Sequence, residues 1–292
     1  MFTAPFPDHH IFQCDLAGAD GWTVACHCAS LGDATMLEDY RFGLKPANII
    51  ANMYQHGAET MKWTREQFKA AAKSVDKNGW LYFACKRVQH ASNYKVSPPT
   101  IQDTVLKDSY KLGGEPIFIP IQTCERLQML YYGRYSAVPR WHMRCSAFLN
   151  STGQLKSASG HTRTFFGRKQ DVGTLKEYLA DEPQENTTWC CNMALWRSWN
   201  DPENRECEGQ CEKELPFPIC ECEKRRLIVK PMHQMHDAVI GCFPTDRTEW
   251  ALPKIKSYFD NPITIAGITV TVPFEGGYGR SWGELDNNIP SI

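Results

Sequence analysis

The sequence predicts an α+β fold, in which an antiparallel sheet is combined with a large helical part. Two apolar runs within residues 226–244, RLIVKPMHQMHDAVIGCFP, indicate two strands that meet at His236 and Asp237 without a glycine turn. The run HHIFQCDL, which begins at residue 9, indicates another strand. Several longer segments keep a helical spacing between starting and stopping residues, so much of the remaining chain is expected to be helical.

The N-terminal quarter contains signals for one strand and several helices. The first strand is expected to end near Asp15, where a turn of small residues opens a helix. The segment LGDATMLEDYRFG predicts a helix that Asp33 caps and Gly43 ends, and residues 45–54 are expected to continue as helix.

The clearest helix prediction runs from Thr64 to Gly79, TREQFKAAAKSVDKNG. Within the helical stretch predicted over residues 120–149, Pro139 is expected to cause a kink or a junction. Beyond these, helices are predicted over residues 80–93, 97–114, 120–149, 174–199 and 245–259, strand and turn over 157–169, and closing strands over 263–275.

Length and composition bound the class of protein. The 292 residues suffice for one large or two modest domains, and a mean hydropathy of −0.45 is typical of a soluble protein. No apolar run approaches the roughly 20 residues of a membrane helix, and the start FTAPFPDHH lacks the features of a signal peptide. A cytoplasmic location and no membrane partner are therefore expected.

Charge is segregated along the chain although its net value is only −1. Residues 62–111 hold ten Lys and Arg against four acids, residues 134–169 hold seven and no acid, and residues 200–223 hold eight acids against two bases. This pattern is typical of a protein that binds a polyanion on one face, and it is equally typical of ordinary solvated helix faces.

Thirteen cysteines in a long chain without an export signal are expected to be mainly free thiols. Cys190 and Cys191 are expected to be packing residues of a helix. The acidic segment CEGQCEKELPFPICEC could close a tetrahedral site for a structural zinc ion, or stay reduced in an exposed loop. Its sulfurs belong to Cys207, Cys211, Cys220 and Cys222.

Two aspartates at strand ends, Asp15 and Asp237, are the first candidates for chemistry. Strand ends of one antiparallel sheet can lie side by side, and two close carboxylates repel unless a divalent cation lies between them. Magnesium prefers a few carboxylates together with substrate phosphates, and two ions about 4 Å apart can serve an in-line displacement. Either aspartate could instead be an ordinary cap or turn residue.

A second group of candidates recurs every four residues and therefore shares one helical face. This group is Tyr82, Lys86, His90 and Tyr94. The lysine offers a cation for phosphate and the rings offer flat surfaces for a base, although aromatic residues at helical spacing are more often core residues.

Taken together, these segments resemble the polymerase region of the DNA polymerase I family (family A), of a phage type. CDLAGADGWTV resembles the first palm motif, SLGDATMLEDYRFG the helix after it, and KRVQHASNY the nucleotide-binding fingers helix. AVPRWHMRC and RTFFGRK resemble the helix and hairpin between fingers and palm, QMHDAV the last palm motif, and EGGYGRSWGEL the usual ending. The resemblance covers nearly the whole chain in the family's order.

The resemblance implies a DNA-directed DNA polymerase that transfers dNTPs to a primer 3′-hydroxyl with two Mg²⁺ ions. Asp15 and Asp237 would hold the ions, and Lys86 would bind the triphosphate and protonate the leaving group. The other implied roles are base stacking by His90, a template-side contact by Tyr94, shaping of the sugar pocket by Asp20, further nucleotide contacts by Tyr82 and Arg87, and DNA contacts by Gln234, His236 and Arg168.

Four positions depart from the family pattern. An arginine of the fingers helix is replaced by Tyr82, a glycine by Lys95, a histidine near the triphosphate by Ala47, and a glutamate by Asp20. Long cations near the expected site, namely Arg87, Lys45 and Lys95, could compensate.

The resemblance also implies an organisation into palm at residues 1–30, fingers at 31–119 and palm at 120–292, with a cysteine-rich acidic insertion at 200–224. In the family the thumb and the exonuclease precede the first palm motif, which begins here at residue 9. We therefore expect a split or fragmentary polymerase whose thumb and exonuclease part lies on another chain, acting on primer–template DNA. A phage protein of this kind would work in the host cytoplasm.

Two rival interpretations stay open. A single-subunit RNA polymerase shares the palm, but it commonly carries methionine at the position of His90 and leaves the position of Asp20 open. A non-catalytic remnant would bind nucleic acid without extending a primer. A reverse transcriptase is disfavoured because the sequence has no paired-aspartate DD turn.

Overall fold

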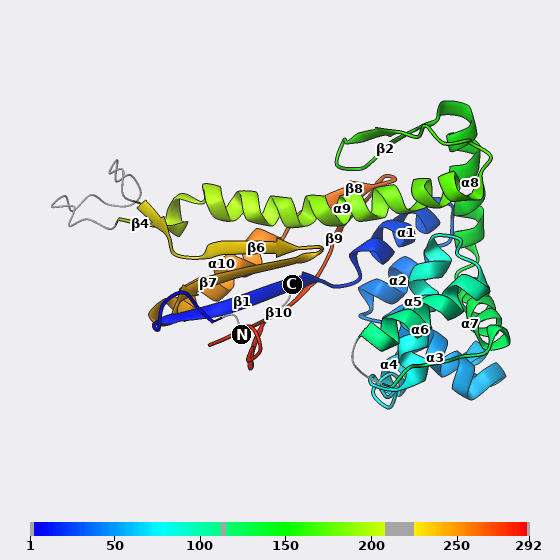
Figure 1. Ribbon diagram of the computed structural model, residues 1–292, viewed down its shortest axis with the longest axis horizontal. Coiled ribbons are helices and arrows are strands. Elements are labelled where there is room, and N and C mark those ends of the chain that lie inside the picture. Colours follow the sequence, from blue (N-terminus) through cyan, green and yellow to red (C-terminus); the bar gives the residue numbers. More distant parts are fainter. Residues whose placement is uncertain (1–2, 112–114, 208–224, 291–292) are drawn as a thin grey trace. The chain divides into compact units, whose positions relative to one another are not determined.

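The computed structural model describes residues 3–111, 115–207 and 225–290, and its elements fall into two compact units (Figure 1). The first unit comprises residues 1–19, 185–263 and 269–292, and the second comprises residues 20–184 and 264–268. The first contains a five-stranded sheet and the second is mainly helical, so the chain has the α+β fold that the sequence predicts.

The sheet of the first unit is antiparallel, with the strand order β11-β10-β1-β7-β6. Its strands are β1 (His9–Leu16), β6 (Lys230–Met235), β7 (Ala238–Pro244), β10 (Phe274–Gly279) and β11 (Asn287–Ile289). The strands predicted around residues 9–15 and 226–244 are thus confirmed. β7 is buried from Ala238 to Phe243 because its apolar side chains are covered on both faces.

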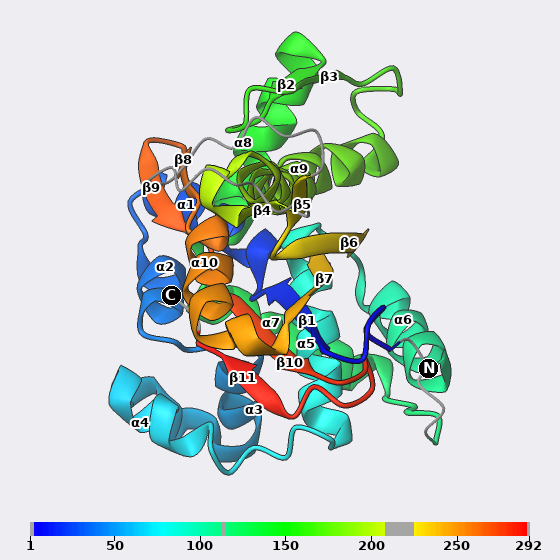
Figure 2. The ribbon, with the colours of Figure 1, turned by 90° about the vertical axis from the view of Figure 1, so that its left-hand side faces the viewer.

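Two helices pack on the central strands of the sheet. These are α10 (Thr248–Phe259) and the part of α9 (Val172–Asn200) that belongs to the first unit. Phe12 and Val239 of the sheet, Leu195 of α9 and Ile255 of α10 line one small gap, and both views of the ribbon show α10 beside β7 (Figures 1 and 2). Strand β4 (Arg205–Cys207) pairs with β5 (Arg225–Leu227), and β8 (Pro262–Ile265) pairs with β9 (Ile268–Thr271), of which residues 264–268 belong to the second unit.

The second unit is a packed set of helices with one small hairpin. Helix α5 packs against α3, α6 and α7, which places it at the centre of this set. The elements are α1 (Ala19–Ser30), α2 (Thr35–Arg41), α3 (Pro46–His56), η1 (Gly57–Lys62), α4 (Arg65–Ala71), α5 (Trp80–Asn93), α6 (Pro98–Lys111), α7 (Ile121–Arg134), α8 (Ala137–Thr152), β2 (Gln154–Lys156) and β3 (Thr162–Thr164).

A fully buried carboxylate ties three of these helices together. Asp39 of α2 is 0% exposed, and it accepts hydrogen bonds from Arg65, from both Nε and Nη2 of Arg134 and from the hydroxyl of Tyr135. A buried charge is tolerated when it is paired and hydrogen-bonded in this way.

Two helix predictions are wrong in extent. The helix expected from Thr64 to Gly79 is α4, which ends at Ala71, although Thr64 caps it in a capping box with Gln67 as expected for a helix start. The stretch 120–149 is two helices, α7 and α8, and the break falls at Tyr135–Ser136 rather than at Pro139.

The predicted cap at Asp33 lies one residue further out than expected. Ala34 is the N-cap of α2, while the Asp33 carboxylate accepts a hydrogen bond from the Thr35 backbone amide at 3.1 Å. Within the described ranges, no helix combines the length and the apolar character that crossing a membrane requires.

Candidate active site

The two candidate metal aspartates lie at the same end of two adjacent central strands. Asp15 of β1 pairs with Ala238 of β7, and the backbone amide of Leu16 donates to the carbonyl oxygen of Asp237 at 3.1 Å. The two aspartates are therefore one ladder step apart, although they lie 222 positions apart in the sequence. Asp15 is exposed and Asp237 is half-buried, so both are open to solvent.

The chain reverses within two residues to reach this position. His236 and Asp237 alone connect β6 to β7, and His236 has a φ of 55°, in the left-handed region that glycine usually occupies. The turn that the sequence indicated without a glycine is thus made by a histidine, and the residue that follows it is the aspartate.

A buried thiol lies beneath the pair. Cys191 of α9 is 0% exposed, and its Sγ donates to the carbonyl oxygen of Asp237 at 3.3 Å. Burial raises the pKa of the Cys191 thiol to about 12, and the charges of Cys190, Asp237 and Asp15 add to the effect. Both aspartates are therefore within electrostatic range of one sulfur atom.

The structure adds a third carboxylate that the sequence did not single out. Glu275 of β10 is exposed and lies directly opposite Asp15 across the ladder. Like charges at directly opposed positions are destabilising unless something compensates them. Glu275 begins the segment EGGYGRSWGEL, so an acid at the start of that motif was the available signal.

The donor set at this edge fits magnesium better than a self-sufficient protein cage. Among the described residues, no group of three or more His, Cys, Asp or Glu side chains is arranged to hold a metal ion by itself. Magnesium commonly takes one or two carboxylates and completes its shell with water and substrate phosphates. Asp15 and Asp237 match that requirement.

The second candidate group lies on α5 as its spacing predicts. Lys86 and His90 are exposed, Tyr82 is half-buried, and Tyr94, which ends the helix, is only 6% exposed. Lys86 and His90 are therefore accessible to a ligand, whereas Tyr94 at the end of the same face is buried.

Asp20 contacts the two residues at the C-terminal end of this face, His90 and Tyr94. The Tyr94 hydroxyl donates to Oδ2 of Asp20 at 2.6 Å, and Nε2 of His90 lies 3.3 Å from the same oxygen. The rings of His90 and Tyr94 meet edge to face with centroids 4.9 Å apart. Burial raises the pKa of Tyr94 well above its usual value, and the charge of Asp20 raises it further, so the hydroxyl stays a donor.

A hydrogen-bond chain that the sequence did not reveal supports this cluster. Nε2 of Gln89 donates to the Tyr40 hydroxyl at 2.9 Å, and Oε1 of Gln89 accepts from the Ala47 amide at 3.1 Å. A Cβ at Gly21, next to Asp20, would lie 1.9 Å from the Tyr40 oxygen. Glycine at position 21 is thus required for α1 to approach α2 this closely.

The residues that depart from the family pattern have distinct surroundings. Arg87 forms an ion pair with Asp108 at 3.0 Å, and its guanidinium lies 5.2 Å from the Phe83 ring centroid. Lys45 and Lys95 are exposed, whereas Ala47 is only 1% exposed. Lys95 has a φ of 55°, so the conformation suited to glycine is kept although the residue is lysine.

The candidate DNA-contact residues lie on both units. Gln234 is half-buried in β6 and His236 is exposed in the turn that follows, while Arg168 is exposed in the segment after β3. The proposed zinc ligands cannot be placed. Cys207 ends β4, but its side chain and the whole of Cys211, Cys220 and Cys222 lie outside the described residues.

Comparison with known proteins finds a similarity to solved structures. No protein-family model matches the sequence, and no curated protein matches it either. Among solved structures, the POL domain of Pol1 from M. smegmatis in complex with DNA primer-template and dNTP matches with a TM-score of 0.65 and 12% identity. The match covers 97% of this chain and 41% of that chain.

The fold is therefore similar to that of a DNA polymerase domain along nearly its whole length. At 12% identity this likeness concerns the fold alone, and the chain spans about two fifths of the length of the structure it matches.

Proposed function

We propose that this chain is the catalytic part of a template-directed DNA polymerase of the DNA polymerase I family, of a phage type. The observation that carries the proposal is the placement of Asp15 and Asp237 one ladder step apart at one end of β1 and β7. The likeness of the fold to a polymerase domain supports it. The reaction is transfer of a deoxynucleotide from its triphosphate to a primer 3′-hydroxyl.

Asp15 and Asp237 would hold two Mg²⁺ ions. Bound there, Mg²⁺ would supply the positive charge that activates the primer hydroxyl and neutralises the triphosphate oxygens. The exposure of Asp15 suits a site that must admit both a primer terminus and a triphosphate. The bonds from Leu16 and Cys191 to the Asp237 carbonyl hold the turn in place.

On α5, Lys86 binds the triphosphate and delivers a proton to the leaving pyrophosphate. His90 stacks on the incoming base, and Tyr94 contacts the template side. Asp20 shapes the sugar pocket, and the hydrogen bond that it accepts from Tyr94, with Nε2 of His90 beside the same oxygen, holds its carboxylate in one orientation.

In this proposal the palm comprises residues 1–30 and 120–292 and the fingers residues 31–119. The compact units divide the chain differently, because residues 120–184 group with the helical unit. The thumb and exonuclease part expected on another chain stays a prediction, which co-purification with a candidate partner tests. Dependence on a zinc ion in the cysteine-rich segment also stays a prediction.

Primer extension with Mg²⁺ and dNTPs tests the proposal. Asp15→Asn and Asp237→Asn should each lower the extension rate by at least about a hundredfold, because a preorganised charge is lost at the reacting phosphate. Asp246→Asn, which changes an exposed aspartate of η3 in the same unit, is the matched control and should extend normally. Near-normal extension by either active-site variant refutes the assignment.

The rivals give different outcomes in the same assay. Preference for ribonucleotides over deoxynucleotides favours a single-subunit RNA polymerase. Tight binding of primer–template without any extension, with the N-terminal partner supplied, favours a non-catalytic remnant.

A further inference from the structure

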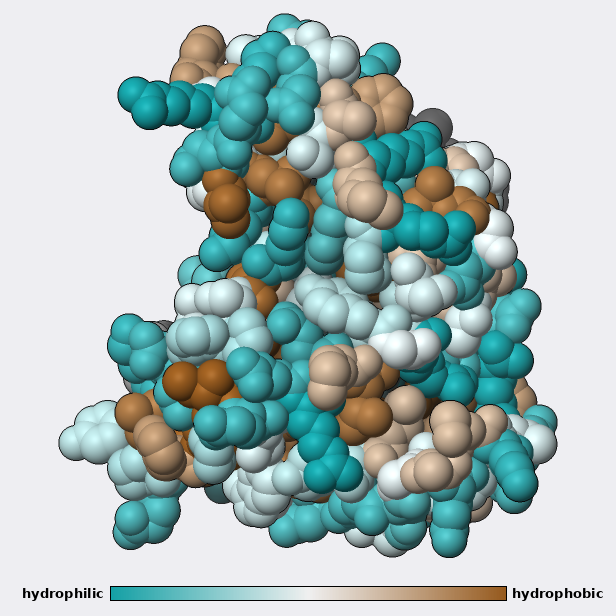
Figure 3. Space-filling view, turned by 90° about the vertical axis from the view of Figure 1, so that its right-hand side faces the viewer, coloured by the Kyte–Doolittle hydropathy of each residue, from teal (hydrophilic) through white to brown (hydrophobic). Residues whose placement is uncertain are grey.

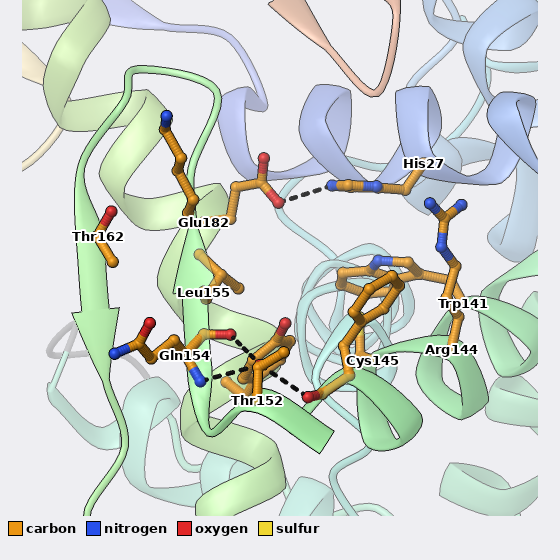
Figure 4. Close-up of a pocket in the computed structure, with 12 residues that line it drawn as sticks. His27, Trp141, Arg144, Cys145, Thr152, Gln154, Leu155, Thr162 and Glu182 are labelled. Carbon is orange, nitrogen blue, oxygen red and sulfur yellow. Dashed lines mark hydrogen bonds and ion pairs between the residues drawn. The ribbon is translucent and has the colours of Figure 1, made fainter. Parts of the chain in front are cut away.

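A pocket in the second unit takes no part in the proposed polymerase site. It has a volume of about 470 Å³, and α1, α8, α9 and the β2–β3 hairpin line it (Figure 4). Neither the aspartates of the sheet nor the α5 residues Lys86, His90 and Tyr94 are among its lining residues. Pockets of this size commonly bind a small molecule or one unit of a polymer.

Flat and apolar side chains form most of its wall. Trp141 and Phe148 of α8, Leu155 of β2 and Tyr178 of α9 contribute rings and a branched chain. Trp141 is stacked on His27 with centroids 5.7 Å apart, and this orders its indole ring. Phe148 is 49% exposed, and apolar side chains also reach the surface among hydrophilic ones in the view of Figure 3.

The charge of the pocket is positive. Among the described residues that line it, Glu182 is the only acidic one, and Nε2 of His27 lies 2.8 Å from its carboxylate (Figure 4). Arg144 and Lys156, by contrast, are exposed, and no ion pair between described residues involves either of them. Arg144 donates to the Ser30 hydroxyl at 3.5 Å, and its guanidinium lies 5.7 Å from the centroid of the Phe148 ring, so cation and ring lie side by side at the pocket. Arg134 and Arg163 are instead paired with carboxylates, those of Asp39 and Asp181.

We propose that this pocket binds one nucleotide unit of single-stranded DNA. Its base stacks on the exposed ring of Phe148, and its phosphates meet Arg144 and Lys156. Aromatic faces accept any base, and cations beside them track the backbone, which is how many proteins hold single strands. A base paired in a duplex cannot leave its stack without cost, so the pocket selects unpaired strand. A second exposed ring lies nearby in sequence, because Phe166 is 95% exposed and its neighbour Phe165 packs on Tyr178 at 5.1 Å.

Binding of a fluorescent twelve-residue oligo(dT) to the full chain, followed by anisotropy in EDTA, tests this proposal. Phe148→Ala should weaken binding about tenfold, because one stacked base is lost. Phe6→Ala is the matched control, since Phe6 is 50% exposed in the other unit, and it should leave binding unchanged.

The salt dependence tests the cations separately. Arg144→Gln with Lys156→Gln should reduce the slope of log K against log salt by about 1.4, or about 0.7 for each phosphate contact of a single strand. Lys256→Gln, an exposed lysine of α10, should leave the slope unchanged. An unchanged slope in the double variant, or unchanged affinity in Phe148→Ala, overturns the proposal.

Two further arms locate the ligand and identify its source. An oligonucleotide carrying 5-iododeoxyuridine should photocrosslink to peptides within residues 137–182, and crosslinks only elsewhere overturn the assignment. Free dTMP should compete at least about a hundredfold less well than the oligonucleotide, and equal competition means a mononucleotide pocket instead. Asp15→Asn and Asp237→Asn should bind the strand normally, so this proposal and the polymerase proposal can fail independently.

Discussion

At the scale of single residues, Gly21 makes the sharpest stability prediction. Alanine there would place its Cβ 1.9 Å from the Tyr40 oxygen, whose position the bond from Gln89 restrains. We expect Gly21→Ala to lower the free energy of unfolding by about 1–3 kcal/mol, the usual cost of overpacking. Urea denaturation measures it.

The same exchange elsewhere in a helix supplies the control. A Cβ at Gly133 of α7 meets nothing within 4 Å, so Gly133→Ala should stabilise the protein by about 0.5–1 kcal/mol through helix propensity. Adding Tyr40→Phe to Gly21→Ala removes the colliding oxygen and should restore part of the loss. Equal effects of the two glycine variants contradict the close approach of α1 and α2.

His142 joins two helices and makes the fold sensitive to acid. Its Nε2 donates to the Asn93 carbonyl at 2.8 Å, which ties α8 to the end of α5, and the Asn93 side chain in turn accepts from the Tyr131 hydroxyl. Burial lowers the pKa of His142 to about 4 from an ordinary value of 6.5.

Because the pKa of His142 is lower in the folded than in the unfolded chain, acid lowers the free energy of unfolding. Above pH 6.5 the imidazole is neutral in both the folded and the unfolded chain, so it has no pH-dependent effect. As the pH falls from 6.5 towards 4, only the unfolded chain takes up the proton, so stability falls by roughly 3 kcal/mol in total. His142→Gln should remove that part of the loss when urea unfolding is compared at pH 7.5 and 4.5. An unchanged pH profile contradicts burial of a neutral histidine.

At the scale of secondary-structure elements, the spacing of apolar residues predicted whether a segment is helix or strand better than it predicted the residue at which the element ends. The helix from Thr64 stops at Ala71 because polar side chains favour turns there. The Ser74 hydroxyl donates to the Ala71 carbonyl, and Asp76 accepts from the Asn78 amide. Pro139 does not break α8, because it is the third residue, where its missing amide has no helical partner to lose.

The candidate site was predictable where one element carries the signal. Residues four apart on α5, and aspartates after strand-like runs, can be recognised from local pattern alone. The pairing of Glu275 with Asp15 could not, because the register between β1 and β10 depends on long-range packing. The bond from Tyr94 to Asp20 joins residues 74 positions apart, and spacing does not reveal such a contact.

At the scale of the whole molecule, the thiols should fall into two classes. Nine of the thirteen cysteines are buried free thiols, and burial raises their pKa, to about 12 for Cys28 and Cys85. At pH 8 these sulfurs are protonated and inaccessible, so at most four of the thirteen should react quickly with a thiol reagent in the folded protein. All thirteen should react in denaturant, and more than four fast thiols in the folded protein contradict the burial.

The two-residue turn between β6 and β7 cannot change in length without displacing Asp237 or β7. Side chains alternate along a strand, so one residue added between Met235 and Ala238 would rotate either β7 or the acid that precedes it to the wrong side. Substitutions there test chemistry, whereas length variants test geometry. Residues of this hairpin other than Asp237 can therefore be substituted more readily than the hairpin can be lengthened or shortened.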